Sequence, residues 1–390
     1  MMPRTLRDAV YITRALGFRY LWIDALCILQ GDSAEAVRDW EMESARMEHI
    51  YGDAVVTLVA AWASHCNGGI IRPEGGFGVG GVTWRGFKHE PINSRAWALQ
   101  EWLLSSRVAT FTSTGAAFFH CSSPAEGAPP TVFGHMIYRF RFPLPPQEPS
   151  SLNWIHIVSN YTSRNLTNAR DKLPAMAGLV RRYDRLTGFK SGRYLAGLWE
   201  ASLMGDLLWR RDVLFDAFFN APQPSRARMG QAPTWSWGSV NGNIAYTTYF
   251  ATGWMAPYVA EVVSCAVVLA TADPYSMVSS GTLVVRGPAK PAPAGCVRVG
   301  DHDTPGLFDG ADYVGTIYLD LDDDAAINMS HRAEALCCLL VCTRVYHHAL
   351  LLQRIREDPD VYERVGLVIS STDEHKAWWE DAEHKTFTIV

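Results

Sequence analysis

The order of apolar and polar positions at the start of the chain predicts a helix followed by a strand. Over residues 5–16 apolar side chains recur every three or four positions, Thr5-Leu-Arg-Asp8 resembles a capping box, and Gly17 ends the pattern. Tyr20–Ile23 is then a short apolar run, rich in aromatic and branched side chains, that predicts a buried strand. Asp24 follows this strand directly.

A second helix and a second strand come next. Residues 33–51 carry apolar positions mainly on one face, and Asp32 or Ser33 can cap this helix. The run 54–61 is apolar throughout and has the length of a strand. A strand, a helix and a strand in this order predict a parallel crossover. Asp24 would then lie at the carboxyl edge of the sheet, where α/β proteins place their sites.

The next polar side chains at close spacing belong to a predicted helix around residues 94–104. Arg95, Gln100 and Glu101 fall within two turns of that helix and can form a polar cluster. Exposed helices form such clusters routinely, so spacing alone does not separate a site from a surface ion pair. The segments 108–111 and 116–121 predict a hairpin after the helix.

The composition and hydrophobic pattern of the chain change three times, which predicts four regions. The expected α/β domain covers residues 1–121, a linker rich in Pro, Gly and Ser covers 122–153, a helical region covers 154–221, and a β-rich region covers 222–390. The clearest amphipathic stretches of the helical region are 173–183 and 194–209. The predicted strands of the last region are 244–250, 259–270, 281–286, 313–321, 335–345, 365–370 and 385–390.

Composition narrows the classes of function. The formal net charge is −5 and 19% of residues are charged, without a long basic run, so a nucleic-acid partner is not expected. The eight cysteines form no CxxC pair, and there is no secretory leader, which favours a reducing, cytoplasmic location. No metal site is predicted. No apolar run reaches the ~20 residues that a membrane span requires. The fourteen tryptophans are expected mainly in cores.

Several ordered blocks together resemble the fungal heterokaryon incompatibility (HET) domain. The blocks within residues 1–121 are Gly17 to Gln30, Trp40-Glu-Met-Glu43 with Met47 and Ile50-Tyr51, Ala54 to Ala61, and Asn93 to Glu101. Further blocks, such as Asp171-Lys-Leu-Pro174 and Pro233-Thr-Trp235-Ser-Trp237-Gly238, look like the downstream region of these proteins. HET domains usually open with a further strand and turn, and the chain begins after that point.

The resemblance implies a cytoplasmic fungal protein of self/non-self recognition that triggers programmed cell death. HET domains are distantly similar to Toll/interleukin-1 receptor (TIR) domains, which have a flavodoxin-like parallel sheet. Some TIR domains cleave NAD with a glutamate in a Trp-x-x-Glu arrangement. Trp40-Glu-Met-Glu43 is similar to that arrangement. The resemblance therefore implies Glu43 and Asp24 as catalytic residues, and it implies substrate-binding roles for the residues Arg95, Trp40, Gln100 and Glu101.

Two classes of function stay open at this point. One is an NAD(P) glycohydrolase, for which NAD is a substrate and no cofactor is needed. The other is an interaction module without catalysis that signals by self-association or by binding another incompatibility protein. A third, weaker alternative is a HET scaffold recruited to small-molecule biosynthesis. The classes differ in whether Asp24, Glu43, Arg95 and Glu101 meet in one pocket or spread over an exposed face.

Overall fold

The computed structural model describes residues 2–71, 90–115, 117–121, 151–212, 232–246, 258–293, 297–299, 305–320, 336–343, 346–355 and 361–390. Contacts within the chain define two compact units. Unit 1 is Met1–Asn153 with Arg164–Phe189, and unit 2 is Trp154–Ser163 with Lys190–Val390. The predicted linker 122–153 lies outside the described residues up to position 150. The predicted helical region 154–221 contributes to both units, and its last part, 213–221, is also outside them.

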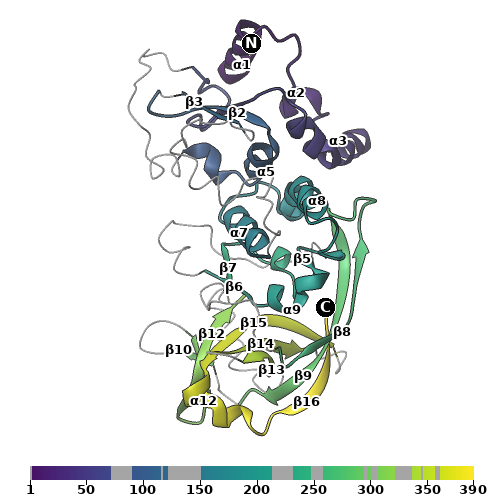
Figure 1. The fold of residues 1–390 in the computed structure, drawn as a ribbon, viewed down its shortest axis with the longest axis vertical. Helices are drawn as coiled ribbons and strands as arrows, with labels where there is room; N and C mark the ends of the chain where they lie inside the picture. Colours follow the sequence, from purple (N-terminus) through teal and green to yellow (C-terminus); the bar gives the residue numbers. More distant parts are fainter. Residues whose placement is uncertain are drawn as a thin grey trace. The chain divides into compact units, whose positions relative to one another are not determined.

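Unit 1 consists of helices and one small sheet (Figure 1). Its helical elements are α1 (Arg4–Ala15), α2 (Asp24–Cys27), α3 (Ala34–Gly52), η1 (Pro91–Ser94), α5 (Trp97–Leu104), η2 (Ala169–Lys172), η3 (Pro174–Met176) and α8 (Ala177–Leu186). Its strands are β1 (Thr57–Ala60), β2 (Arg107–Phe111) and β3 (Ala117–Cys121). The predicted helices before residue 62 are therefore confirmed. The predicted hairpin is confirmed as the antiparallel pair β2 and β3.

The predicted parallel pairing of Tyr20–Ile23 with 54–61 is wrong. β1 pairs in parallel with β2 instead, with Thr57 opposite Val108. Residues 20–23 form no strand, and the side chain of Tyr20 is 86% exposed. Both apolar runs line one cavity, described below, and an apolar pattern does not distinguish a cavity wall from a strand inside a sheet. The flavodoxin-like parallel sheet is thus reduced to two short parallel strands.

The predicted capping box at the start of α1 is also wrong. α1 begins without a side-chain cap, and the polar side chains of its first turns bind a distant loop instead. The Thr5 hydroxyl accepts a hydrogen bond from the Gly69 N–H at 3.0 Å, and Asp8 accepts from the N–H groups of Ile70 and Ile71 at 2.8 and 3.1 Å. A tertiary contact therefore uses the residues that the local pattern assigned to capping. The Ser33 cap of α3 is confirmed, because its hydroxyl accepts from the N–H of residue 36.

The helices α3, α5 and α8 pack against one another in unit 1. Gln100 of α5 is fully buried, and its side-chain oxygen accepts a hydrogen bond from the Gly178 N–H of α8 at 3.3 Å. A Cβ at position 178 would lie 2.9 Å from both Gln100 and Leu104, so the glycine allows this close approach. The packing fixes α5, the helix that carries Glu101.

The first part of unit 2 is built around buried tryptophans. The predicted amphipathic stretch 194–209 is not one helix: it forms β4 (Tyr194–Leu195), β5 (Leu198–Trp199), η4 (Glu200–Ser202), α9 (Leu203–Asp206) and the start of β6 (Trp209–Arg211). Ala196 and Gly197 have φ of 49° and 109°, a left-handed turn that stops any helix there. The side chains of Trp154 and Trp237 both donate to the Gly197 carbonyl, at 3.3 and 2.8 Å. The tryptophans of this part of the chain therefore contribute buried apolar surface to the core, as the sequence analysis predicts.

The rest of unit 2 is a large, mainly antiparallel sheet, so the β-rich C-terminal region is confirmed. Besides α7 (Ser151–Thr162), η5 (Trp237–Ser239), β7 (Ile244–Tyr246) and α12 (Thr372–Trp379), its elements are β8 (Glu261–Leu269), β9 (Val278–Pro291), β10 (Val297–Val299), β11 (Pro305–Asp309), β12 (Asp312–Leu319), β13 (Leu336–Thr343), β14 (Tyr346–Arg354), β15 (Val361–Ser371) and β16 (Glu383–Ile389). The strands β15, β14, β13, β9 and β16 pair in that order, and β16 pairs back to β15. These pairings close a ring, which protects strand edges.

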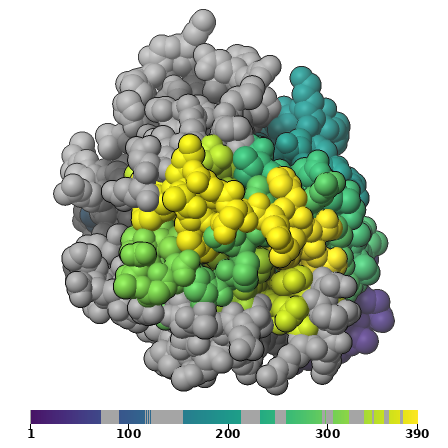
Figure 2. All heavy atoms as spheres, turned by 90° about the horizontal axis from the view of Figure 1, so that it is seen from below, coloured from purple at the N-terminus to yellow at the C-terminus, as the bar shows by residue number. Residues whose placement is uncertain are grey.

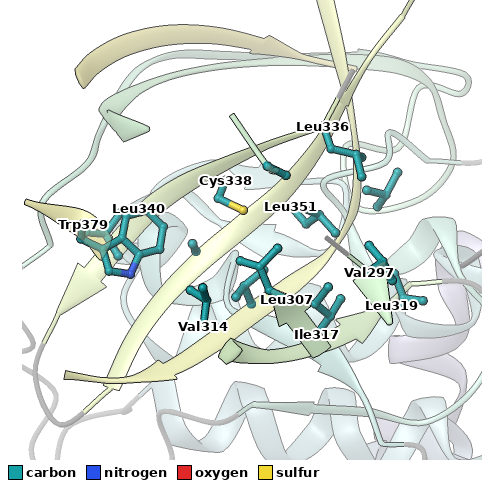
Figure 3. Packing of buried hydrophobic residues seen from close by; sticks show 14 residues of the cluster. Val297, Leu307, Val314, Ile317, Leu319, Leu336, Cys338, Leu340, Leu351 and Trp379 are labelled. Carbon is teal, nitrogen blue, oxygen red and sulfur yellow. The ribbon is translucent and has the colours of Figure 1, made fainter. Parts of the chain in front are cut away.

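Alternating side chains of these strands form a continuous apolar core (Figure 3). Leu307, Ile317, Cys338 and Leu351 are almost completely buried there, and Trp379 of α12 packs at the margin. On the face shown in Figure 2, the green and yellow C-terminal segments lie next to one another. The strands β13, β14 and β15 are buried at consecutive positions, on both faces, which explains why short apolar runs identified them from the sequence.

Candidate functional site

Unit 1 contains a cavity of about 1010 Å³. Its walls come from α1, the extended segment 18–23, the start of α2, the end of α3, residues 53–66 with β1, and residues from 92–102, together with Ile70 and Arg164. Most of the wall is apolar, and its polar side chains include Glu101 and the four groups that interact with it: Asp24, Tyr51, Arg95 and Arg164. We call these five residues the polar cluster. A concave apolar cavity with a few convergent polar groups is the usual form of a small-molecule site.

Three members of the polar cluster are placed by helices. Asp24 is the first residue of α2, directly after the extended Ile23, and its carboxylate accepts from its neighbouring N–H at 2.7 Å. Tyr51 is the second-last residue of α3, and its ring contacts Trp22 edge to face at 5.8 Å. Glu101 lies in the middle of α5. Helix ends and helix faces therefore bring together residues that are up to 77 positions apart in the sequence.

The two arginines of the polar cluster come from segments that are hydrogen-bonded to each other. Asn165 donates from its N–H to the Ser94 carbonyl at 2.6 Å and accepts from the Ala96 N–H at 3.0 Å. The Arg164 guanidinium also donates to the Arg95 carbonyl at 3.4 Å. Arg95 itself is extended and precedes α5, so the prediction that it lies within that helix is wrong. The paired segments hold both guanidinium groups beside the cavity.

The electrostatics of the polar cluster centre on Glu101. Burial raises the pKa of its carboxyl group from 4.5 to about 7. The positive charge of Arg95 opposes this rise, the negative charge of Asp24 adds to it, and the hydrogen bond from the Tyr51 hydroxyl and the charge of Arg164 oppose it. A carboxyl group that changes its charge near neutral pH can accept or donate a proton during a reaction.

Two neighbours of Glu101, Tyr51 and Arg164, keep their ordinary charge states near neutral pH. Burial, helped by the charge of Glu101, raises the pKa of Tyr51 far above its usual value, so its hydroxyl stays a hydrogen-bond donor. Burial lowers the pKa of Arg164 to about 10, and the charge of Glu101 limits the decrease, so Arg164 remains a cation. Glu101, which titrates near neutral pH, thus shares the cavity with the cationic Arg164.

The other three predicted site residues do not line this cavity. Glu43 is 17% exposed on α3 and accepts a hydrogen bond from Arg46 at 2.7 Å. Trp40 contacts Trp97 edge to face at 6.1 Å. Gln100 joins α5 to α8, as described above. Asp24, Arg95 and Glu101 are therefore the predicted residues that the structure brings together, and the roles assigned to all six remain predictions.

Sequence reasoning missed two members of the polar cluster. Tyr51 falls on the apolar face of the predicted second helix, so its position alone does not predict a site residue. Arg164 carries no local signal, because its contribution depends on the backbone pairing of Asn165 with residues 94 and 96. A conserved pattern across relatives is the kind of signal that could have found them.

Asp24 and Tyr51 both belong to a segment that matches a known family. Residues 1–74 match the family model of the heterokaryon incompatibility protein (HET). The HET resemblance predicted from the sequence is thereby confirmed for these residues. No curated protein and no solved structure matches the chain, so similarity to TIR domains stays a prediction.

Two further properties of the described residues bear on the site. They contain no group of three or more His, Cys, Asp or Glu side chains arranged to hold a metal ion. Among the helices described, none combines the length and apolarity needed to cross a membrane.

Proposed function

We propose that unit 1 is a HET-type effector domain of fungal self/non-self recognition that hydrolyses the nicotinamide–ribose bond of NAD or NADP. The observation that supports this proposal is the polar cluster: two carboxyl groups and two guanidinium groups line one cavity of about 1010 Å³. The size and composition suit a nucleotide, whose phosphates require cations and whose ring systems require apolar and aromatic walls. An interaction module would not need a titrating carboxyl group inside a cavity.

The two carboxyl groups have separate roles in the proposed reaction. The bond between ribose C1′ and the nicotinamide nitrogen breaks, and both electrons leave with nicotinamide. Asp24 stabilises the positive charge that develops on the ribose, as carboxylates do in other glycoside-cleaving sites. Glu101, in its ionised form, accepts a proton from water while the water oxygen bonds to C1′. The products are nicotinamide and ADP-ribose, and Glu101 leaves the step protonated.

The Tyr51 hydroxyl orients the Glu101 carboxylate through their hydrogen bond. Because the pKa of Glu101 is about 7, the base form predominates above neutral pH and turnover should rise as pH increases through this value. Arg95 and Arg164 bind the phosphates. These roles replace Glu43 by Glu101 as the principal carboxylate, because Glu43 is absent from the cavity wall.

The test is incubation of the purified full chain with NAD and NADP, at high protein concentration because assembly can be required for activity. Released nicotinamide is measured by chromatography. Glu101→Gln and Asp24→Asn should each lower kcat by roughly two decades or more. Glu41→Gln, which changes an exposed residue of α3, is the matched control and should retain parental activity.

The variant Glu43→Gln separates the two carboxylate assignments. It should retain most of the activity if Glu101 is the base. A loss of two decades in Glu43→Gln with an active Glu101→Gln would return the catalytic role to Glu43. No turnover of either nucleotide by the parent at any protein concentration would refute the enzymatic proposal and favour the interaction module.

A further inference from the structure

The two arginines of the polar cluster are held as a pair by backbone hydrogen bonds. The hydrogen bonds between Asn165 and residues 94 and 96, together with the Arg164 contact to the Arg95 carbonyl, fix the two segments relative to each other. Both guanidinium groups line the same cavity. A guanidinium group presents a planar fork of donors that matches phosphate oxygens, so two adjacent forks fit two linked phosphates.

Glu101 stands next to this pair and interacts with both of its charges. The groups that face Glu101 are Tyr51 from α3, Asp24 from α2, and the two arginines. Further charged or titratable side chains of the cavity wall are Arg19, Arg46, His49, Asp53, His65 and Cys66. The two arginines favour the ionised form of Glu101, whereas burial and Asp24 favour its neutral form. The proton on Glu101 therefore depends on the charge balance at the arginines.

We propose that Arg95 and Arg164 bind the pyrophosphate diester of a dinucleotide as a two-site clamp, and that its binding is coupled to proton uptake by Glu101. This inference rests on the proposed function, because it concerns the same cavity and the same substrate class. An anion bound at the arginines offsets their positive charge. The arginines then stabilise the ionised form of Glu101 less, whereas burial and the charge of Asp24 still destabilise it. The proton affinity of Glu101 therefore increases.

The coupling has a consequence for the reaction cycle. The substrate NAD carries a positively charged nicotinamide ring as well as two phosphate charges, so its ring compensates part of the anionic effect on Glu101. The product ADP-ribose lacks that ring and retains the phosphates. The product complex should therefore hold the proton that Glu101 has just accepted from water. Release of ADP-ribose would then be accompanied by release of this proton.

The experiment measures ADP-ribose binding to the full chain by isothermal titration calorimetry. ADP-ribose contains the pyrophosphate diester but lacks the bond that would be cleaved, so binding is measured without turnover. Titrations at about pH 8 in buffers with different ionisation enthalpies give the number of protons exchanged. We expect uptake of a substantial fraction of one proton by the parent, and affinity that increases as pH falls towards 7.

Three variants and one control define the outcomes. Arg95→Gln and Arg164→Gln should each weaken ADP-ribose binding about tenfold or more, with circular dichroism showing that both variants fold. Glu101→Gln should bind ADP-ribose without proton uptake. Arg7→Gln, at an exposed position of α1 outside the cavity wall, should behave as the parent does.

The inference is overturned if the parent does not bind ADP-ribose, if binding proceeds without proton uptake, or if Glu101→Gln takes up as many protons as the parent. Parental affinity in both arginine variants would overturn the clamp. These results are distinguishable from failure of the proposed function. If ADP-ribose binding is coupled to proton uptake but NAD is not cleaved, the clamp is supported and only the hydrolase activity is refuted. If NAD is cleaved but ADP-ribose binding is not coupled to proton uptake, the hydrolase activity is supported and the coupled clamp is refuted.

Discussion

Replacement of Glu101 by glutamine should change how the stability of unit 1 depends on pH. The pKa of the Glu101 carboxyl group rises from 4.5 in the unfolded chain to about 7 in the folded unit. Between these values the folded state holds more protons than the unfolded state, so stability falls as pH increases from 4.5 to about 7. At about 1.4 kcal/mol for each pKa unit, the ionised carboxyl group costs about 3 kcal/mol above neutral pH.

Glutamine has nearly the same shape and cannot ionise, and its oxygen can still accept the hydrogen bond from Tyr51. The variant should therefore be more stable than the parent by up to about 3 kcal/mol at about pH 8, and the difference should vanish below pH 4.5. The assay is urea unfolding of the full chain at a series of pH values, with pulsed hydrogen exchange of peptides from α3 and α5 as the readout for unit 1.

Glu41→Gln is the control, because Glu41 is exposed on α3 and its replacement should change stability by less than about 0.5 kcal/mol at every pH. A difference between Glu101→Gln and the parent that does not vary with pH would refute the reasoning. So would a variant that is less stable than the parent at about pH 8, because Glu101 would then be stabilised as a carboxylate.

Two further substitutions test contacts inside unit 2 and inside unit 1, respectively. Asp320→Asn should destabilise unit 2 by about 3 to 5 kcal/mol in thermal unfolding, because it leaves the fully buried Arg364 without its carboxylate partner at 3.1 Å. Glu383→Gln, which changes an exposed ion pair, is the control and should cost less than about 1 kcal/mol. Gly178→Ala should destabilise unit 1 by about 1 to 3 kcal/mol, measured by the same hydrogen exchange, because its Cβ would meet side chains of α5 at 2.9 Å. Gly52→Ala, whose Cβ has no contact closer than 3.8 Å, should be close to neutral, and equal effects of the two alanine variants would contradict the packing argument.

Elements whose patterns depend on near neighbours could be predicted from the sequence alone. The periodicity of α1 and α3, the Ser33 cap, the β2–β3 hairpin and the C-terminal strands all follow from spacings of two to four residues, which set the face of a helix or strand. The HET resemblance over residues 1–74 also required only the order of short motifs. These features need no knowledge of which distant segments meet.

Tertiary structure decided the features in which distant residues meet. Leu21–Ile23 line a cavity without forming a strand, and an apolar pattern does not identify the hydrogen-bonding partner of a segment. Thr5 binds a loop 64 positions away rather than its own helix end. The polar cluster joins Asp24 and Glu101, which the sequence suggested, to Tyr51 and Arg164, which it did not. Their proximity arises from helix packing and backbone pairing across the chain, and the pKa of Glu101 depends on that proximity and on burial.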